Sequence, residues 1–84
     1  MNNALILIPV FNEELNVGKV LDECTKHFEN ILVVDDGSTD ETIREIKKFN
    51  QIKLLKHCIN CGQGTSIATG IQYFLGQTSF EYLI

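Results

Sequence analysis

Three clusters in the sequence hold most of the residues that could bind a ligand. They are residues 9–14 (PVFNEE), 35–40 (DDGSTD) and 57–64 (HCINCGQG). The second cluster opens with two adjacent carboxylates, Asp35 and Asp36, directly after an apolar run. Partial burial and mutual repulsion make such ionised carboxylates costly unless hydrogen-bond donors face them. A nucleoside would supply these donors, through the N–H groups of its base and the hydroxyls of its ribose.

The third cluster also raises the question of metal or thiol chemistry. Cys58 and Cys61 have C-x-x-C spacing, and His57 stands beside them. A structural zinc site needs four ligands, and only Cys24 and His27, far upstream, could complete one. A single C-x-x-C pair is weak support for such a site, so two thiols in a loop is the simpler interpretation. The three cysteines are too few for a disulfide scaffold, which predicts reduced thiols.

Short apolar runs predict strands, of which the first two have the pattern of strands buried on both faces. The runs lie at residues 4–8, 31–34 and 52–55, and residues 81–84 have the pattern of the opening of a fourth strand. Pro9 is expected to end the first strand, because proline cannot donate to a strand ladder. Lys53 and Lys56 indicate that the third strand lies in a more accessible position at the edge of the sheet.

Apolar residues at helical spacing predict a helix after each of the first three strands. One helix is expected over about residues 15–28 and another over about residues 63–75, each with an apolar stripe that faces the core. The stripes are formed by Val17, Val20, Leu21, Cys24 and Phe28 and by Ile67, Ala68, Ile71, Phe74 and Leu75. A third stripe, formed by Ile43, Ile46 and Phe49, follows a capping-box pattern at residues 38–41, in which Asp40 competes as the N-cap.

The alternation of strands and helices predicts an α/β fold. Strands separated by helices imply βαβ crossovers and a parallel sheet, here in a Rossmann-like βαβαβαβ order. Ligands of such sheets bind beyond the carboxyl ends of the strands. Because each polar cluster follows a strand, we expect all three clusters to converge on one crevice.

Length and charge narrow the class of protein. A chain of 84 residues is one small domain or part of a larger one, and 44% hydrophobic with 21% charged residues is typical of globular proteins. A net charge of −4 argues against nucleic-acid binding, which needs a basic surface. No apolar stretch approaches the ~20 residues of a membrane span, and no secretory signal is recognisable. We therefore expect no transmembrane segment and a cytoplasmic location.

Taken together, the three clusters resemble the N-terminal half of a family 2 glycosyltransferase with the GT-A fold. The motifs are PVFNEE at residues 9–14, VVDDGSTD at 33–40 and NCGQG at 60–64, in the order and spacing of the family. The pattern is similar to that of dolichol-phosphate mannosyltransferase and the polyprenyl-phosphate sugar transferases. The resemblance covers residues 1–84, and it implies that they form the N-terminal nucleotide-sugar-binding part of a truncated GT-A domain.

The resemblance implies a nucleotide site built from the three clusters. Asp35 would accept a hydrogen bond from the imino edge of a uracil or guanine base, and Glu13 would accept hydrogen bonds from the ribose hydroxyls. Gly37 would let the backbone turn close to the nucleotide. The full set of expected nucleotide-binding residues is Pro9, Phe11, Glu13, Asp35, Asp36, Gly37, Asn60 and Gly62.

Local structural roles are the alternative for several polar residues. Ser38 and Asp40 are expected to cap a helix or close a turn rather than touch a ligand. Glu13 and Glu14 could be first-turn acids that complement a helix dipole, with one in that role while the other binds. His57 is expected to be a solvated residue at the end of a strand.

Two departures from the family pattern affect the expected chemistry. Gln63 stands where the family usually has a basic residue, in patterns such as N-x-G-K-G. The Asp-x-Asp metal motif of the family follows the fourth strand, and this sequence has no Asp after Asp40. Ligands for Mg²⁺ or Mn²⁺ are therefore expected beyond Ile84, and no catalytic or metal-binding residue is expected within the chain. The 84 residues alone are not expected to transfer sugar.

The resemblance implies that the parent protein moves a sugar from a UDP- or GDP-sugar to an acceptor, such as a polyprenyl phosphate at the cytoplasmic face of a membrane. The alternative is a non-catalytic nucleotide-binding module or a degenerate fragment, which the missing metal motif and Gln63 favour. Two other nucleotide fingerprints fail. The G-x-G-x-x-G pattern is not completed because Ile67 stands three residues after Gly64, and no G-x-x-x-x-G-K pattern is present.

Overall fold

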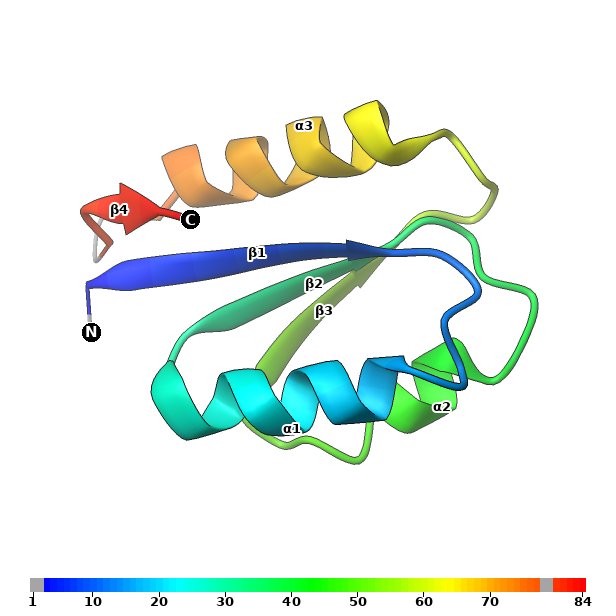
Figure 1. The fold of residues 1–84 in the computed structure, drawn as a ribbon. Helices are drawn as coiled ribbons and strands as arrows, with labels where there is room; N and C mark the ends of the chain where they lie inside the picture. Colours follow the sequence, from blue (N-terminus) through cyan, green and yellow to red (C-terminus); the bar gives the residue numbers. More distant parts are fainter. Residues whose placement is uncertain (1–2, 78–79) are drawn as a thin grey trace.

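Four strands alternate with three helices along the chain, in agreement with the predicted order (Figure 1). The computed structural model describes residues 3–77 and 80–84, and every structural statement below refers to these residues. The elements are β1 (Ala4–Val10), α1 (Val17–His27), β2 (Ile31–Asp35), α2 (Thr42–Ile46), β3 (Ile52–Lys56), α3 (Gln63–Leu75) and β4 (Tyr82–Leu83).

The strands form one parallel sheet in the order β3-β2-β1-β4. The ladder of β1 and β2 pairs Ile6 with Ile31 at one end and Val10 with Asp35 at the other. This register brings the carboxyl ends of β1 and β2 level with each other, so the loops that follow them leave the sheet side by side. The lysine pattern of β3 is confirmed as that of an edge strand in the described sheet.

Helices cover both faces of the sheet (Figure 1). The helices α1 and α2 lie on one face, and α3 lies on the other. Every residue of the strand β2 is buried, and its side chains alternate between two clusters. Ile31 and Val33 pack in the cluster between the sheet and the helices α1 and α2. Leu32 and Val34 pack in the cluster between the sheet and α3.

Pro9 does not end β1, which continues to Val10. The backbone N–H of Ile6 donates to Asn30 on the β2 side, and that of Leu7 donates to Ile84 on the β4 side, each at 2.9 Å. Because alternate residues of a strand direct their backbone groups to the same side, the nitrogen of Pro9 points to the side of β4. Pro9 therefore leaves the ladder between β1 and β2 intact, in which it is paired with Val34, and the strand continues past it.

The first helical stripe is largely confirmed. Val17 and Leu21 are buried, and Cys24 and Phe28 pack against the same cluster. Val20 is the exception, because 46% of its surface is exposed. The helix α2 is one short turn of five residues, and Phe49 beyond its end still packs against the core.

The face that α3 turns toward the sheet differs from the predicted stripe. Its buried residues are Ser66 and Gly70. Of the predicted stripe, Phe74 packs against the cluster that includes Leu32, whereas the other members, Ile67, Ala68, Ile71 and Leu75, are exposed. A Cβ atom on Gly70 would lie only 2.3 Å from a methyl carbon of Leu7 in β1. The helix therefore approaches the sheet along its small residues, and the bulky ones flank the contact.

None of the helices in residues 3–77 and 80–84 combines the length and the apolar character that crossing a lipid bilayer requires.

Candidate functional site

Hydrogen bonds between the loops after β1 and β2 fix the first side of the site. The backbone N–H of Asn12 donates to Ser38 Oγ at 2.9 Å, and the backbone N–H of Thr39 donates to Asn12 Oδ1 at 2.8 Å. The backbone N–H of Glu13 donates to Thr42 Oγ1 at 2.8 Å. These contacts join the two loops and fix the backbone of Glu13, which positions its side chain.

Ser38 and Asp40 have local structural roles, as expected from the sequence. Asp40 Oδ1 accepts the backbone N–H of Thr42 at 2.9 Å at the start of α2, and Asp40 Oδ2 accepts the backbone N–H of Glu14 at 3.3 Å. Asp40 rather than Ser38 therefore stabilises the start of α2. Ser38 contacts Asp35 and Asn12 instead, so the capping-box pattern is not formed.

Asp35 is buried in the turn after β2 and does not line the candidate pocket. Its Oδ2 atom accepts the backbone N–H of Ser38 at 3.0 Å, and its Oδ1 atom accepts the Ser38 hydroxyl. Its side chain continues the alternation of Ile31 and Val33, which face α1 and α2. The expected contact between Asp35 and a base therefore has no support in this geometry, because the carboxylate is held by its own turn.

Asp36 is the carboxylate that lines the pocket. Its Oδ1 atom accepts the backbone N–H of Cys61, and its Oδ2 atom accepts the backbone N–H of Gly62, both at 2.8 Å. His57 Nδ1 lies 2.9 Å from Oδ1. The hydrogen bond from His57, followed by that from Cys61, holds the pKa of Asp36 below its ordinary value of 3.8. Asp36 is therefore ionised at neutral pH despite its burial.

His57 is not a solvated strand-end residue, so that expectation is wrong. Its side chain is only 17% exposed, and its second ring nitrogen, Nε2, lies 2.9 Å from Thr69 Oγ1 in α3. A neutral ring that donates from Nδ1 to Asp36 accepts the Thr69 hydroxyl proton at Nε2. His57 thereby connects the end of β2 to α3.

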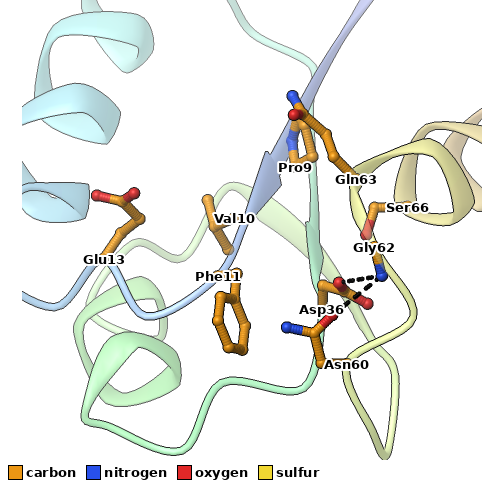
Figure 2. A pocket seen from close by; sticks show the side chains of 9 residues that line it. All are labelled: Pro9, Val10, Phe11, Glu13, Asp36, Asn60, Gly62, Gln63 and Ser66. Carbon is orange, nitrogen blue, oxygen red and sulfur yellow. Dashed lines mark hydrogen bonds between the residues drawn. The ribbon is translucent and has the colours of Figure 1, made fainter.

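A pocket of about 320 Å³ opens where the three clusters meet (Figure 2). Six of the eight expected nucleotide-binding residues line it, and Asp35 and Gly37 do not. In Figure 2, Val10 and Phe11 stand between Glu13 on one side and Asp36 with Asn60 on the other. The lining residues are Pro9, Val10, Phe11, Glu13, Asp36, Asn60, Gly62, Gln63 and Ser66. The volume is at the lower end of the range for small-molecule sites, roughly 300–1,000 Å³.

Gly37 contacts the third cluster instead of the pocket. Its φ angle is +74°, and a Cβ atom there would lie 2.5 Å from the carbonyl carbon of Ile59 and 2.7 Å from the backbone nitrogen of Asn60. Glycine is therefore required for the loops after β2 and β3 to approach each other. This contact places Asn60 beside the end of β2.

Sequence reasoning did not assign Val10, Gln63 and Ser66 to the pocket. Gln63 and Ser66 belong to the first turn of α3, and the first turn of a helix that follows a parallel strand lies beside the carboxyl edge of the sheet. Position in the first turn is thus the signal that could have identified both residues.

Asp36, His57 and Cys61 together form a group that could hold a metal ion, since one ligand atom from each lies within 4.8 Å of the other two. Cys24 and His27 are not part of this group, so the four-ligand zinc site considered from the sequence is not formed. Asp36 and His57 are hydrogen-bonded to each other, and Cys61 contributes a thiol. Mg²⁺ and Mn²⁺ prefer oxygen ligands, and the described residues do not fit the metal that the family resemblance implies.

Several curated proteins are similar to this chain. An uncharacterized protein of Methanocaldococcus jannaschii is 41% identical over 84% of this chain and 29% of that protein. The UDP-N-acetylglucosamine-dolichyl-phosphate N-acetylglucosaminyltransferase of Methanococcus voltae is 31% identical over 84% of this chain and 36% of its own length. A dolichyl-phosphate beta-glucosyltransferase of Trichomonas vaginalis is 29% identical, over 86% and 27% respectively.

The chain spans between a quarter and somewhat over a third of the length of the curated relatives it matches, from 25% to 37%. The sequence model of the family described as glycosyl transferase family 2 matches residues 5–84, which is nearly the whole chain. The parallel α/β sheet agrees with the GT-A resemblance of the three clusters. The chain therefore belongs to glycosyl transferase family 2.

Proposed function

We propose that this chain binds the nucleotide of a UDP- or GDP-sugar for a glycosyltransferase, in the pocket at the carboxyl ends of β1, β2 and β3. The observation that carries the proposal is the carboxylate of Asp36, which is ionised and buried and yet lines that pocket. A buried charge of this kind stabilises a ligand that brings an N–H donor.

Asp36 has one acceptor position left for such a donor. An ionised carboxylate offers about four acceptor positions, and Asp36 uses two on Oδ1 and one on Oδ2. The remaining position on Oδ2 accepts the imino N–H of a uracil or guanine base. Adenine and cytosine carry no proton on the corresponding ring nitrogen, so the site disfavours them.

Phe11 and Glu13 form the opposite side of the nucleotide site. The side chain of Phe11 is 40% exposed and lines the pocket, which leaves its ring available for stacking against a base or ribose. The Glu13 carboxylate accepts hydrogen bonds from the ribose hydroxyls. Val10 and Phe11 stand between Glu13 and Asp36 in Figure 2, so the two acids face different parts of a bound nucleotide.

Asn60 and Gly62 form the third wall and keep Asp36 in place. The backbone N–H of Gly62 donates to Asp36 Oδ2 at 2.8 Å and to Asn60 Oδ1 at 3.0 Å (Figure 2). The amide group of Asn60 therefore has a fixed orientation at the pocket, with its N–H₂ group left to donate to a base.

The transfer reaction is a proposal for the whole protein. The Methanococcus voltae relative is named for a UDP-sugar donor and a dolichyl-phosphate acceptor. On that similarity, we infer a polyprenyl phosphate acceptor at the cytoplasmic face of a membrane. Mg²⁺ or Mn²⁺ would neutralise charge on the departing diphosphate, with ligands beyond Ile84.

Titration of the isotope-labelled chain with UDP, GDP, CDP and ADP, followed by amide NMR shifts, tests the proposal. UDP or GDP is expected to shift the amides of Phe11, Asn60 and Gly62, and CDP and ADP are expected to bind more weakly. The exposed residues of α1, such as Asp22, serve as the internal control. Equal binding of all four nucleotides, or shifts confined to α1, would contradict the proposed site.

A matched titration with Mn²⁺ separates the base site from the metal site. Because the described residues do not fit Mn²⁺, adding the ion is expected to change the affinity of this chain for UDP or GDP by less than about threefold, which corresponds to less than about 0.7 kcal/mol. A much larger increase would show that metal ligands lie within the chain.

A further inference from the structure

The hydroxyl of Ser66 is the one buried side-chain group without a hydrogen-bond partner in the part of the chain that the structure describes. Ser66 has no exposed surface, yet it lines the pocket beside Asp36 and Gly62 (Figure 2). A buried hydroxyl without a partner is unfavourable, and most buried polar groups in folded proteins are paired. No hydrogen bond within the described residues explains why this hydroxyl is present.

Packing does not explain the choice of serine. The backbone N–H of Ser66 already donates to the carbonyl oxygen of Gly62, at 3.2 Å, as the helix requires. Alanine would fill nearly the same space, has a higher helix propensity and would bury no polar atom. The hydroxyl is therefore a candidate for contact with something that enters the pocket.

The rotation of α3 directs Ser66 toward the pocket. Gly70 lies one turn further along the same face of the helix and packs closely against Leu7. This contact fixes which face of α3 meets the sheet. Ser66, in the first turn, then reaches beyond the carboxyl end of β1, where the pocket opens.

We propose that Ser66 is a second polar contact for the nucleobase, with its hydroxyl bonded to the base atom beside the N–H that Asp36 accepts. The inference rests on the proposed nucleotide site. Uracil and guanine both carry a carbonyl oxygen next to the imino N–H, so an acceptor from Asp36 and a donor from Ser66 match that edge. A phosphate in this position would be repelled by the ionised Asp36.

Ser66→Ala is the direct test, and Thr65→Ala is the matched control, because Thr65 is exposed on the same turn and does not line the pocket. The affinities for uridine and UDP are measured by NMR titration, with guanosine and GDP used if guanine binds more tightly. Ser66→Ala is expected to weaken nucleoside and nucleotide by the same factor, roughly three- to tenfold, as for one neutral hydrogen bond. Thr65→Ala is expected to change neither.

Thermal unfolding of the same variants gives a second readout. Because the hydroxyl has no partner in the fold, Ser66→Ala is expected to keep or raise the melting temperature. A clear fall in melting temperature would show that the hydroxyl is bonded within the protein, and the inference would be wrong.

The binding outcomes are distinguishable. Wild-type affinity in Ser66→Ala would overturn this inference while the proposed function stands. A loss for UDP without a loss for uridine would assign the hydroxyl to a phosphate and would also overturn it. Absence of any nucleotide binding by the wild-type chain would overturn the proposed function, and the inference would fail with it.

Discussion

His57 Nδ1 lies 2.9 Å from Asp36 Oδ1 and connects the acid of the pocket to α3. The other ring nitrogen of His57 lies 2.9 Å from Thr69 Oγ1. One imidazole therefore joins the ends of β2 and β3 to α3. Asp36 is held from three directions, because the backbone N–H groups of Cys61 and Gly62 also donate to it.

Removal of this imidazole is expected to weaken both the fold and nucleotide binding. His57→Ala leaves Asp36 and Thr69 each without one partner, which we expect to lower the free energy of unfolding by about 1–3 kcal/mol. Nucleotide affinity should also fall, because Asp36 loses the contact that orients it. Urea unfolding and calorimetric titration with UDP or GDP measure the two effects.

Two variants control for other causes. His27→Ala removes an exposed histidine of α1 and should leave both quantities unchanged. His57→Gln, whose amide can donate to Asp36 and accept from Thr69, should recover part of both losses. If His57→Ala bound nucleotide as tightly as the wild type, His57 would have no positioning role.

The lowered pKa of Asp36 predicts a loss of stability in acid. Because the hydrogen bond from His57 makes this pKa lower in the folded than in the unfolded chain, ionised Asp36 stabilises the fold above its unfolded value of 3.8. That contribution is lost as the pH falls through the lower, folded pKa. The free energy of unfolding should therefore decrease below about pH 4.

Urea unfolding at a series of acidic pH values measures this dependence in the wild type and in Asp36→Asn. The variant should be less stable near neutral pH and should lose less on acidification. Some slope should persist in the variant, because Asp40 also titrates with a lowered pKa. Burial raises the pKa of Asp40, but the hydrogen bonds from Thr42 outweigh that effect. Parallel curves for the two proteins would contradict the assignment to Asp36.

Gly37 is predicted to be the least replaceable glycine of the loops. Gly37→Ala places a Cβ atom 2.5 Å from the backbone of Ile59 at a φ angle of +74°, so the loop after β3 must move. We expect a loss of at least about 2 kcal/mol in the free energy of unfolding, together with weaker nucleotide binding.

Gly64→Ala is the matched control for Gly37→Ala. A Cβ atom on Gly64 meets no described atom within 4 Å, and the residue lies in the first turn of α3. This variant should be neutral or more stable by up to about 1 kcal/mol, because alanine favours the helix. Similar losses in the two alanine variants would argue against the close approach of the loops.

The overall fold could be predicted because the sequence marks it locally. Short apolar runs separated by amphipathic segments indicate a parallel sheet covered on both faces, and the structure confirms that arrangement. The bounds of α3 agree with the prediction at both ends, 63 and 75. The convergence of the three polar clusters follows from the same topology, since the strands all point the same way.

The choice between Asp35 and Asp36 could not be made from the sequence. Successive residues of a strand face opposite sides, so Asp35 follows Ile31 and Val33 toward α1, whereas Asp36 follows Leu32 and Val34 toward α3. The motif places both acids at the end of the strand but does not say which of them faces a ligand. Which side carries the pocket depends on where α3 packs, and local patterns do not state that.

The packing face of α3 also required the structure. Apolar spacing favours the stripe that includes Ile67 and Ile71, but both residues are exposed. The buried residues of α3 are Ser66 and Gly70, and Gly70 permits the close approach to Leu7, while Phe74 packs further along the helix. Apolar periodicity detects helix faces that carry large apolar side chains. It does not detect a face that packs closely because its side chains are small.

Calorimetric titration of the wild type, Asp36→Asn and Asp35→Asn with UDP and GDP tests the central claim most directly. Asp36→Asn should bind roughly 10- to 100-fold more weakly, as expected for one charge-assisted hydrogen bond. Asp35→Asn should chiefly lose stability, because its carboxylate is bonded to Ser38 within its own turn. Unchanged affinity in folded Asp36→Asn, with lost affinity in folded Asp35→Asn, would contradict the assignment of the base-binding carboxylate.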